Sequence, residues 1–225
     1  TGASGKGPAF VVERELMGSL QSSRGRRAGT QKPEKPGEFN PPFPVVGVGA
    51  SAGGLSAFRN FLEHLTSTTG MAYVLIPHLA PHHESVMPAI LQKSTPLPVE
   101  EARDGMTVEP NHVYIVKPNE LLVVRGSTLA AIPRAEDRKA EGIDHFFVSL
   151  ARDYRDRAIG VILSGTASDG TEGLRAIKAE GGITFAQDDS AEFGDMPRNA
   201  IASGESSPSM VCISPSRPCL GPSYE

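Results

Sequence analysis

The chain has 225 residues, of which 39% are hydrophobic and 21% charged, and its formal net charge is −4. This size and composition are typical of one globular domain with a buried core, and no apolar run is long enough to cross a bilayer, which argues against membrane insertion. The first 40 residues carry a local charge of +3, which leaves −7 on the remainder, so the acidic body argues against a nucleic-acid partner.

The sequence also bears on location. Its N-terminal residues lack the basic-then-apolar pattern of a secretory signal peptide. Its two cysteines, Cys212 and Cys219, lie near the C-terminus, outside any patterned core. They argue against a disulfide framework and fit a reducing compartment, so we expect a cytoplasmic protein.

The chain divides into three parts. Residues 1–42 are rich in Gly, Ser, Arg, Lys and Pro with little periodicity, which predicts a disordered leader or linker. Residues 43–204 form the patterned domain, with strands predicted at 45–48, 71–76, 97–102, 159–163 and 183–187. Helices are predicted at 55–65, 86–91, 143–154, 174–180 and 197–204. Residues 205–225 hold Ser, Pro and Cys with little apolar pattern, which predicts an irregular tail.

The middle of the domain has a different pattern. Apolar runs at 113–116 and 121–124 flank a turn-like segment at 117–120, which predicts a small antiparallel hairpin. Elsewhere strands alternate with helices, which predicts a three-layer α/β fold with a mainly parallel sheet. Crossovers in such sheets are right-handed, so the carboxyl ends of the strands share one edge, where ligand and catalytic groups gather.

A glycine-rich turn follows the first strand. Gly49-Ala50-Ser51-Ala52-Gly53 matches the pattern G-x-S-x-G, in which glycines permit a sharp strand-to-helix turn that exposes the serine hydroxyl. The N–H groups at the start of the next helix can hold a negative oxygen. The same stretch also fits a loosened phosphate or dinucleotide loop, or a turn that only packs, and the turn alone leaves these alternatives open.

Two more polar residues fall at the same predicted edge. His78 ends the second strand, and Asp169 lies in the turn after the strand at 159–163. With Ser51 they supply the residue types of a nucleophile, a general base and the carboxylate that orients the base. Each also has a structural interpretation, because His78 can bond a neighbouring carbonyl and Asp169 can cap the following helix with Glu172 at the capping-box spacing.

Cofactor and metal sites fit the sequence less well. A nicotinamide site needs Asp or Glu at the end of the second strand, and this strand ends in His78. His82, His83 and Glu84 invite a metal interpretation, but adjacent histidines point in different directions and no fourth ligand is evident. No cofactor and no metal are therefore predicted. The chain order Ser, His, Asp also differs from the order Ser, acid, His of α/β-hydrolases.

Several motifs together resemble a known family. They are the turn Gly49-Ala50-Ser51-Ala52-Gly53-Gly54, the strand end Pro77-His78 with Pro81, the triplet Arg103-Asp104-Gly105, the stretch Val161-Ile162-Leu163-Ser164-Gly165 leading to Asp169-Gly170, and Met196-Pro197-Arg198. This set resembles the catalytic domain of the chemotaxis-receptor methylesterase CheB over about residues 43–204. The stretch 165–171 is most similar to the form found in CheB/CheR fusion proteins.

The resemblance implies a Rossmann-like, three-layer α/β domain that hydrolyses γ-glutamyl methyl esters on the helical cytoplasmic part of chemoreceptors. Deamidation of receptor glutamines is a related implied activity, and a CheR-type methyltransferase module is an implied partner. Ser51 matches the family nucleophile, His78 the base and Asp169 the acid. The backbone N–H groups of Ala52 and Thr166 would hold the oxyanion.

This sequence departs from the family pattern in several places. Ala52 stands where threonine is frequent, Thr166 replaces a methionine, and Ala167 replaces a glycine, which strains the backbone if φ is positive there. Gly194-Asp195 reverses the usual order. After Gly204 the family's valine-rich strand is missing, so we expect the sheet to lack a strand. The chain leaves no room for a phosphorylated receiver domain, so regulation by aspartyl phosphate within it is not expected.

These departures keep two other hypotheses open. One is a catalytically degenerate domain that binds receptors or a methyltransferase module as a signalling component. The other is a Rossmann-like cofactor binder, against which His78 in place of an acid argues.

Overall fold

The computed structural model describes residues 39–78, 86–133, 142–203 and 210–213. Within these ranges the main sheet has seven parallel strands in the order β10-β9-β8-β1-β2-β5-β3. They are β1 (Val45–Ala50), β2 (Ala72–Pro77), β3 (Val99–Glu101), β5 (Val113–Ile115), β8 (Ala158–Ile162), β9 (Ile183–Gln187) and β10 (Met210–Ile213). A second, antiparallel sheet in the order β4-β7-β6 contains β4 (Met106–Thr107), β6 (Glu120–Arg125) and β7 (Thr128–Pro133).

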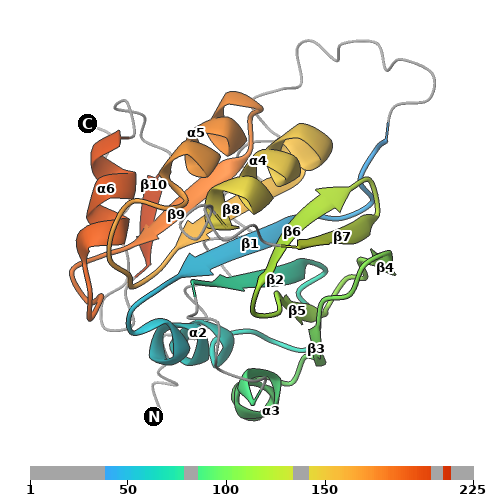
Figure 1. Ribbon diagram of the computed structural model, residues 1–225, viewed down its shortest axis with the longest axis horizontal. Helices are drawn as coiled ribbons and strands as arrows, with labels where there is room; N and C mark the ends of the chain where they lie inside the picture. Colours follow the sequence, from blue (N-terminus) through green and yellow to red (C-terminus); the bar gives the residue numbers. More distant parts are fainter. Residues whose placement is uncertain (1–38, 79–85, 134–141, 204–209, 214–225) are drawn as a thin grey trace, which may run out of the picture.

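Helices cover both faces of the main sheet (Figure 1). They are α2 (Gly54–Leu62), α3 (Met87–Leu91), α4 (Gly142–Tyr154), α5 (Thr171–Ala179) and α6 (Asp195–Ser203), with short 3-10 turns at Gln92–Ser94 and Arg155–Arg157. No helix in the described ranges is both long and apolar enough to cross a membrane.

The sheet is buried on both faces. On one face, Phe58 and Leu62 of α2 share a buried cluster with Val46 and Val48 of β1. On the other face, α4, α5, α6 and the β6–β7 hairpin enclose a second cluster, to which Phe147 of α4 belongs. Alternate residues of a strand point to opposite faces, so strands that are apolar at every position need cover on both sides. The predicted three-layer α/β fold with a mainly parallel sheet is confirmed.

Strand β1 lies between β8 and β2, and its backbone pairing continues past the strand ends. The His78 N–H donates to the Ala50 carbonyl at 2.8 Å, and the Ser51 N–H donates to the Ser164 carbonyl at 3.0 Å. These bonds join residues at or just after the ends of three neighbouring strands. The fold therefore brings the carboxyl ends of β8, β1 and β2 together at one edge.

The predicted hairpin between 113–116 and 121–124 is wrong in its pairing. Strand β5 joins the main sheet, parallel to β2 and β3, and all three of its residues are buried. The antiparallel partner of β6 is β7, joined through the two-residue turn of Gly126 and Ser127, in which Gly126 has φ 57°. A two-residue hairpin turn favours residues that adopt positive φ, whereas a strand buried on both faces fits a parallel sheet.

The prediction that the sheet lacks a strand after Gly204 is also wrong, because β10, within the predicted tail, pairs in parallel with β9 at the sheet edge. The run Met210–Ile213 is only four residues long and stands among Ser and Pro, so its apolar pattern is weak. Pairing to an existing strand edge supplies the order that such a short segment lacks alone. Residues 1–38 of the predicted leader, and 205–209 and 214–225 of the predicted tail, lie outside the described residues.

Candidate functional site

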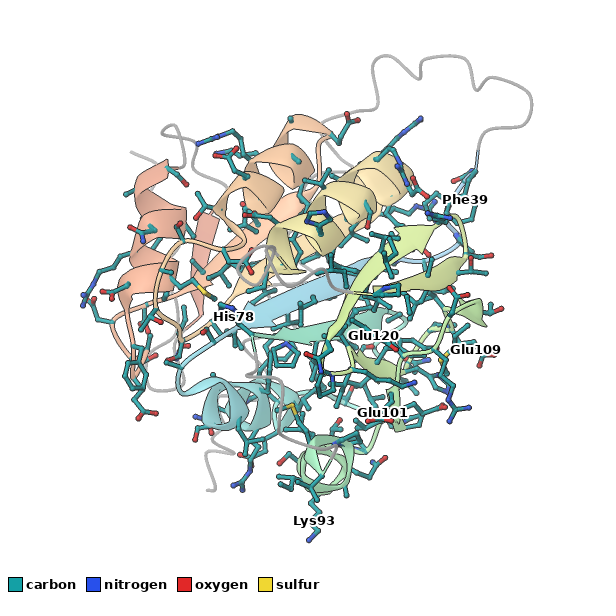
Figure 2. The ribbon with its side chains drawn as sticks, viewed as in Figure 1. Phe39, His78, Lys93, Glu101, Glu109 and Glu120 are labelled. Atoms are coloured by element: carbon teal, nitrogen blue, oxygen red, sulfur yellow. The ribbon has the colours of Figure 1, made fainter. Side chains whose placement is uncertain are left out.

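Ser51, His78 and Asp169 lie at one edge of the sheet. Ser51 directly follows β1, His78 directly follows β2, and Asp169 lies in the loop between β8 and α5. Because β1 is hydrogen-bonded to both β2 and β8, the three residues follow adjacent strands. Figure 2 shows His78 far from Phe39, which precedes the amino end of β1, so the site is at the carboxyl edge of the sheet.

The Ser51 and His78 side chains approach each other directly. The Ser51 hydroxyl oxygen is 3.5 Å from His78 Nδ1. A neutral imidazole with its proton on Nε2 presents Nδ1 as an acceptor for the serine proton. The distance is at the outer limit of a hydrogen bond, which is common for catalytic pairs without substrate.

Asp169 is 7% exposed and binds two backbone N–H groups. Its Oδ2 accepts a hydrogen bond from the Ile143 N–H at 3.1 Å, and its Oδ1 accepts one from the Asp144 N–H at 3.0 Å. Both donors belong to the first turn of α4, whose N–H groups have no partner within the helix. The interpretation of Asp169 as the cap of α5 is therefore wrong: the residue before α5 is Gly170, without a side-chain cap, and Asp169 caps α4 instead.

Burial of its carboxyl group raises the pKa of Asp169 from 3.8 to about 6. The N–H groups of Asp144 and Ile143 lower this pKa, the carboxylate of Asp144 raises it, and the charge of His78 lowers it. The Asp169 carboxyl group is thus within electrostatic reach of the His78 ring. The two side chains also line the same pocket.

The pocket beside His78 and Asp169 is partly lined by the β5–β6 connection. Lys117, Asn119 and Glu120 contribute to its wall, together with the first residues of α4. The sequence pattern assigned these three residues to the turn of a hairpin, so their position beside the site was missed. Only the corrected pairing, with β5 next to β2 in the main sheet, brings this connection to the same edge.

Ser164 holds the turn that carries Ser51. Its hydroxyl donates to the Ala52 carbonyl at 2.9 Å and accepts from the Phe193 N–H at 3.0 Å. Its own N–H donates to the Gln187 side-chain oxygen at 2.9 Å. Ser164 is 1% exposed. The sequence signal for this role is the place of Ser164 directly after the buried apolar run 159–163.

The turn and the neighbouring loop approach each other closely. Gly53 has φ 70°, a conformation that favours glycine, and it directly precedes α2. A Cβ on Gly165 would lie 3.0 Å from Ser51 Cβ and 2.7 Å from Met196 Sδ. Among the described residues, the backbone N–H groups of Ala52 and Thr166 make no hydrogen bond, so both remain available to a ligand oxygen.

Comparison with known proteins identifies the family. The family model of CheB methylesterase matches residues 46–214, which is most of the chain. The chain belongs to the CheB methylesterase family. The catalytic domain of the Thermotoga maritima CheB methylesterase, a crystal structure, has a similar fold, with a TM-score of 0.66 and 27% identity over 72% of this chain and 89% of that one.

Two relatives are named for an enzymatic activity. A protein-glutamate methylesterase/protein-glutamine glutaminase 1 of Myxococcus xanthus is 40% identical over 171 residues, which cover 73% of this chain and 49% of the relative. A protein of Leptospira interrogans named "Putative protein-glutamate methylesterase/protein-glutamine glutaminase" is 33% identical over 162 residues, which cover 71% of this chain and 84% of the relative. The chain thus spans about half the length of the Myxococcus relative.

Ala167, which replaces a glycine of the CheB pattern, has φ 72° and is exposed. We expect Ala167→Gly to stabilise the protein by about 0.5–1 kcal/mol, because the left-handed conformation costs an L-residue about 1–2 kcal/mol while glycine loses about 0.5–1 kcal/mol more entropy on folding. Urea unfolding of both proteins measures the difference. Ser168→Gly, in the same loop but without positive φ, is the control and should lower stability.

Metal-ligand geometry is not found in the described part of this CheB domain, where no three His, Cys, Asp or Glu side chains are grouped to hold an ion. His82, His83 and Glu84 lie outside the described residues.

Proposed function

We propose that this chain hydrolyses γ-glutamyl methyl esters of chemoreceptor cytoplasmic domains and releases methanol. The observation that carries the proposal is the approach of the Ser51 hydroxyl to His78 Nδ1 at 3.5 Å, with the buried Asp169 carboxyl group in the loop that follows the neighbouring strand β8. Membership of the CheB methylesterase family and the names of two relatives support the substrate class.

Ser51 is the nucleophile and His78 its base. Neutral His78 removes the hydroxyl proton as Oγ attacks the ester carbonyl, and the imidazolium then protonates the departing methoxide. Asp169 orients the ring and stabilises its charge. Water, activated by His78, then attacks the acyl-enzyme and releases the glutamate side chain. The same sequence with a glutamine releases ammonia, which accounts for deamidation.

Backbone N–H groups stabilise the oxyanion of the tetrahedral intermediate. Ala52 offers one at the start of the turn before α2, and Thr166 offers the other. Main-chain donors keep this role whatever the side chain, so the replacement of the family methionine by Thr166 does not remove it. One such donor contributes on the order of 10²–10³ in rate.

We assign the chain a cytoplasmic location, where the methylated receptor domain and a CheR-type methyltransferase module are its partners. The positive φ of Ala167, two residues before Asp169, favours one alternative: a degenerate domain that binds receptors but turns over poorly. A Rossmann-like cofactor binder is less well supported, because His78 and not an acid follows β2.

Methanol release from methylated receptor cytoplasmic fragments tests the proposal. The purified chain should release methanol, and mass spectrometry should show glutamate at the methylated positions. A rate no higher than that of Ser51→Ala, together with retained receptor binding, would establish the degenerate domain instead.

Activity should depend on pH through the Asp169 carboxyl group, which must be ionised to stabilise the His78 imidazolium. Because the pKa of Asp169 is about 6, kcat/KM should decline below about pH 6 and stay level above it until other groups titrate. The profile is measured from about one pH unit below to about two above the Asp169 pKa of about 6, with circular dichroism at each pH as the control for folding. A flat profile would contradict the assignment.

A further inference from the structure

Carboxylate side chains link the N-terminal ends of α4 and α5 by hydrogen bonds. Asp169, which precedes α5, caps α4 through the N–H groups of Ile143 and Asp144. In return, Oδ1 of Asp144 accepts a hydrogen bond from the N–H of Gly173, in the first turn of α5, at 2.7 Å. Each helix thus supplies an acceptor for the N-terminal N–H groups of the other.

This exchange determines where Asp169 lies. Asp169 is two residues before the first residue of α5, and Thr166, Ala167 and Ser168 of the preceding loop are exposed. The hydrogen bond that the Gly173 N–H donates to Asp144 fixes the first turn of α5 against α4. The two hydrogen bonds that Asp169 accepts fix its carboxyl group at the N-terminal end of α4. A shift of α5 would therefore move Asp169 relative to His78, which is attached to a different strand.

We propose that Asp144 is a positioning residue of the site: its hydrogen bond to the Gly173 N–H holds α5 on α4 so that the Asp169 carboxylate faces His78. This inference rests on the proposed function for its kinetic consequence, but its geometric content does not depend on catalysis. Asp144 does not touch substrate and is not a catalytic residue.

Asp144 also belongs to the electrostatic environment of Asp169. The groups that face or adjoin the Asp169 carboxyl are His78 after β2, Lys117 and Glu120 across the pocket, Asp144 on α4, and Glu172 in the first turn of α5. Glu172 is exposed and paired with Arg175 at 2.6 Å. The carboxylate of Asp144 raises the pKa of Asp169, so removing its charge should lower that pKa.

Two substitutions separate hydrogen bonding from charge. Asp144→Asn keeps Oδ1 as an acceptor for the Gly173 N–H but removes the charge, whereas Asp144→Ala removes both. A matched control lies on the same helix: Asp153 Oδ2 accepts the Gly126 N–H at 2.7 Å, away from the site. Asp153→Ala therefore removes one carboxylate-to-backbone bond of α4 without touching α5.

We expect Asp144→Ala to lower kcat by about 10–100-fold with KM little changed, while Asp144→Asn and Asp153→Ala stay within about threefold of the wild type. Asp144→Asn should also move the acid limb of the pH profile to lower pH, because it removes the charge that raises the pKa of Asp169. Equal losses in Asp144→Asn and Asp144→Ala, or in Asp153→Ala and Asp144→Ala, would overturn the proposal.

A second measurement does not depend on activity. Carboxyl carbon NMR follows the pKa of Asp169, whose signal is identified by its loss in Asp169→Asn. Because the charge of His78 lowers the pKa of Asp169, His78→Gln should raise it in the wild type and in Asp144→Asn, but hardly in Asp144→Ala. An equal rise in all three backgrounds would refute the positioning role even if the protein proves inactive, so the two proposals fail separately.

Discussion

Replacing Ser51 with alanine is expected to lower the rate of methyl ester hydrolysis by about 10⁴-fold or more, because removing the proposed nucleophile leaves only binding and oxyanion stabilisation. His78→Ala should fall to a similar low rate. The double variant should be no slower than either single variant, since a nucleophile without its base and a base without its nucleophile are equally unproductive. Methanol release at substrate saturation measures all three rates.

A matched serine on the following helix provides the control. Ser56 is exposed on α2, five residues after Ser51 in the chain, and Ser56→Ala should retain the wild-type rate. Multiplicative losses in the Ser51 and His78 double variant would show that the two residues act independently and would remove the proposed pairing.

The placement of the three candidate residues at one edge of the sheet could be predicted from the sequence because it depends on topology. Ser51, His78 and Asp169 each follow a buried apolar strand, and parallel strands place such positions at one edge of the sheet. The three residues therefore lie together although they are far apart in the sequence. What the sequence could not supply was the strand order, which makes β8, β1 and β2 direct neighbours.

The errors of the sequence interpretation have a common cause: pairing partners are chosen by tertiary packing. The segment 113–116 is a short apolar run beside a turn-like segment, which is typical of a hairpin strand. Its strand residues are completely buried, however, and belong to the parallel sheet. The four residues of β10 gain their order from β9. Asp169 has the spacing of a local cap, yet it caps α4, whose first turn is more than 20 residues earlier in the chain.

Asp169→Asn is expected to lower the rate of hydrolysis by about 10³–10⁴-fold while leaving the protein folded. The loss arises because asparagine cannot stabilise the imidazolium of His78 and offers one acceptor oxygen where the carboxylate offers two. An NH₂ group would then face the N–H of Ile143 or Asp144, which costs stability. Removal of a buried charge opposes that cost. Because the charge forms only as Asp169 ionises, the effect of Asp169→Asn on stability depends on pH, and this distinguishes it from the loss of activity.

The sign of that dependence follows from the pKa of Asp169, which is raised from 3.8 to about 6 in the folded protein. Between these values the folded state binds a proton that the unfolded state has released, so the contribution of Asp169 to stability is complete below about pH 4 and is lost as the pH rises through about 6. At about 1.4 kcal/mol per pKa unit, the rise in the Asp169 pKa from 3.8 to about 6 corresponds to about 3 kcal/mol of stability. Asp169→Asn lacks this titration, so its stability relative to the wild type should increase by about that amount between pH 4 and pH 7.

Urea unfolding at pH 4 and pH 7 measures the difference, with Asp153→Asn as the control, because Asp153 also accepts a backbone N–H of another element but lies away from His78. If Asp169→Asn and the wild type kept the same difference in stability at both pH values, the Asp169 carboxyl group would not be held in a desolvated site. A low activity of Asp169→Asn with the expected pH-dependent gain in stability would instead mean that the fold keeps a destabilising buried carboxylate where the chemistry needs it.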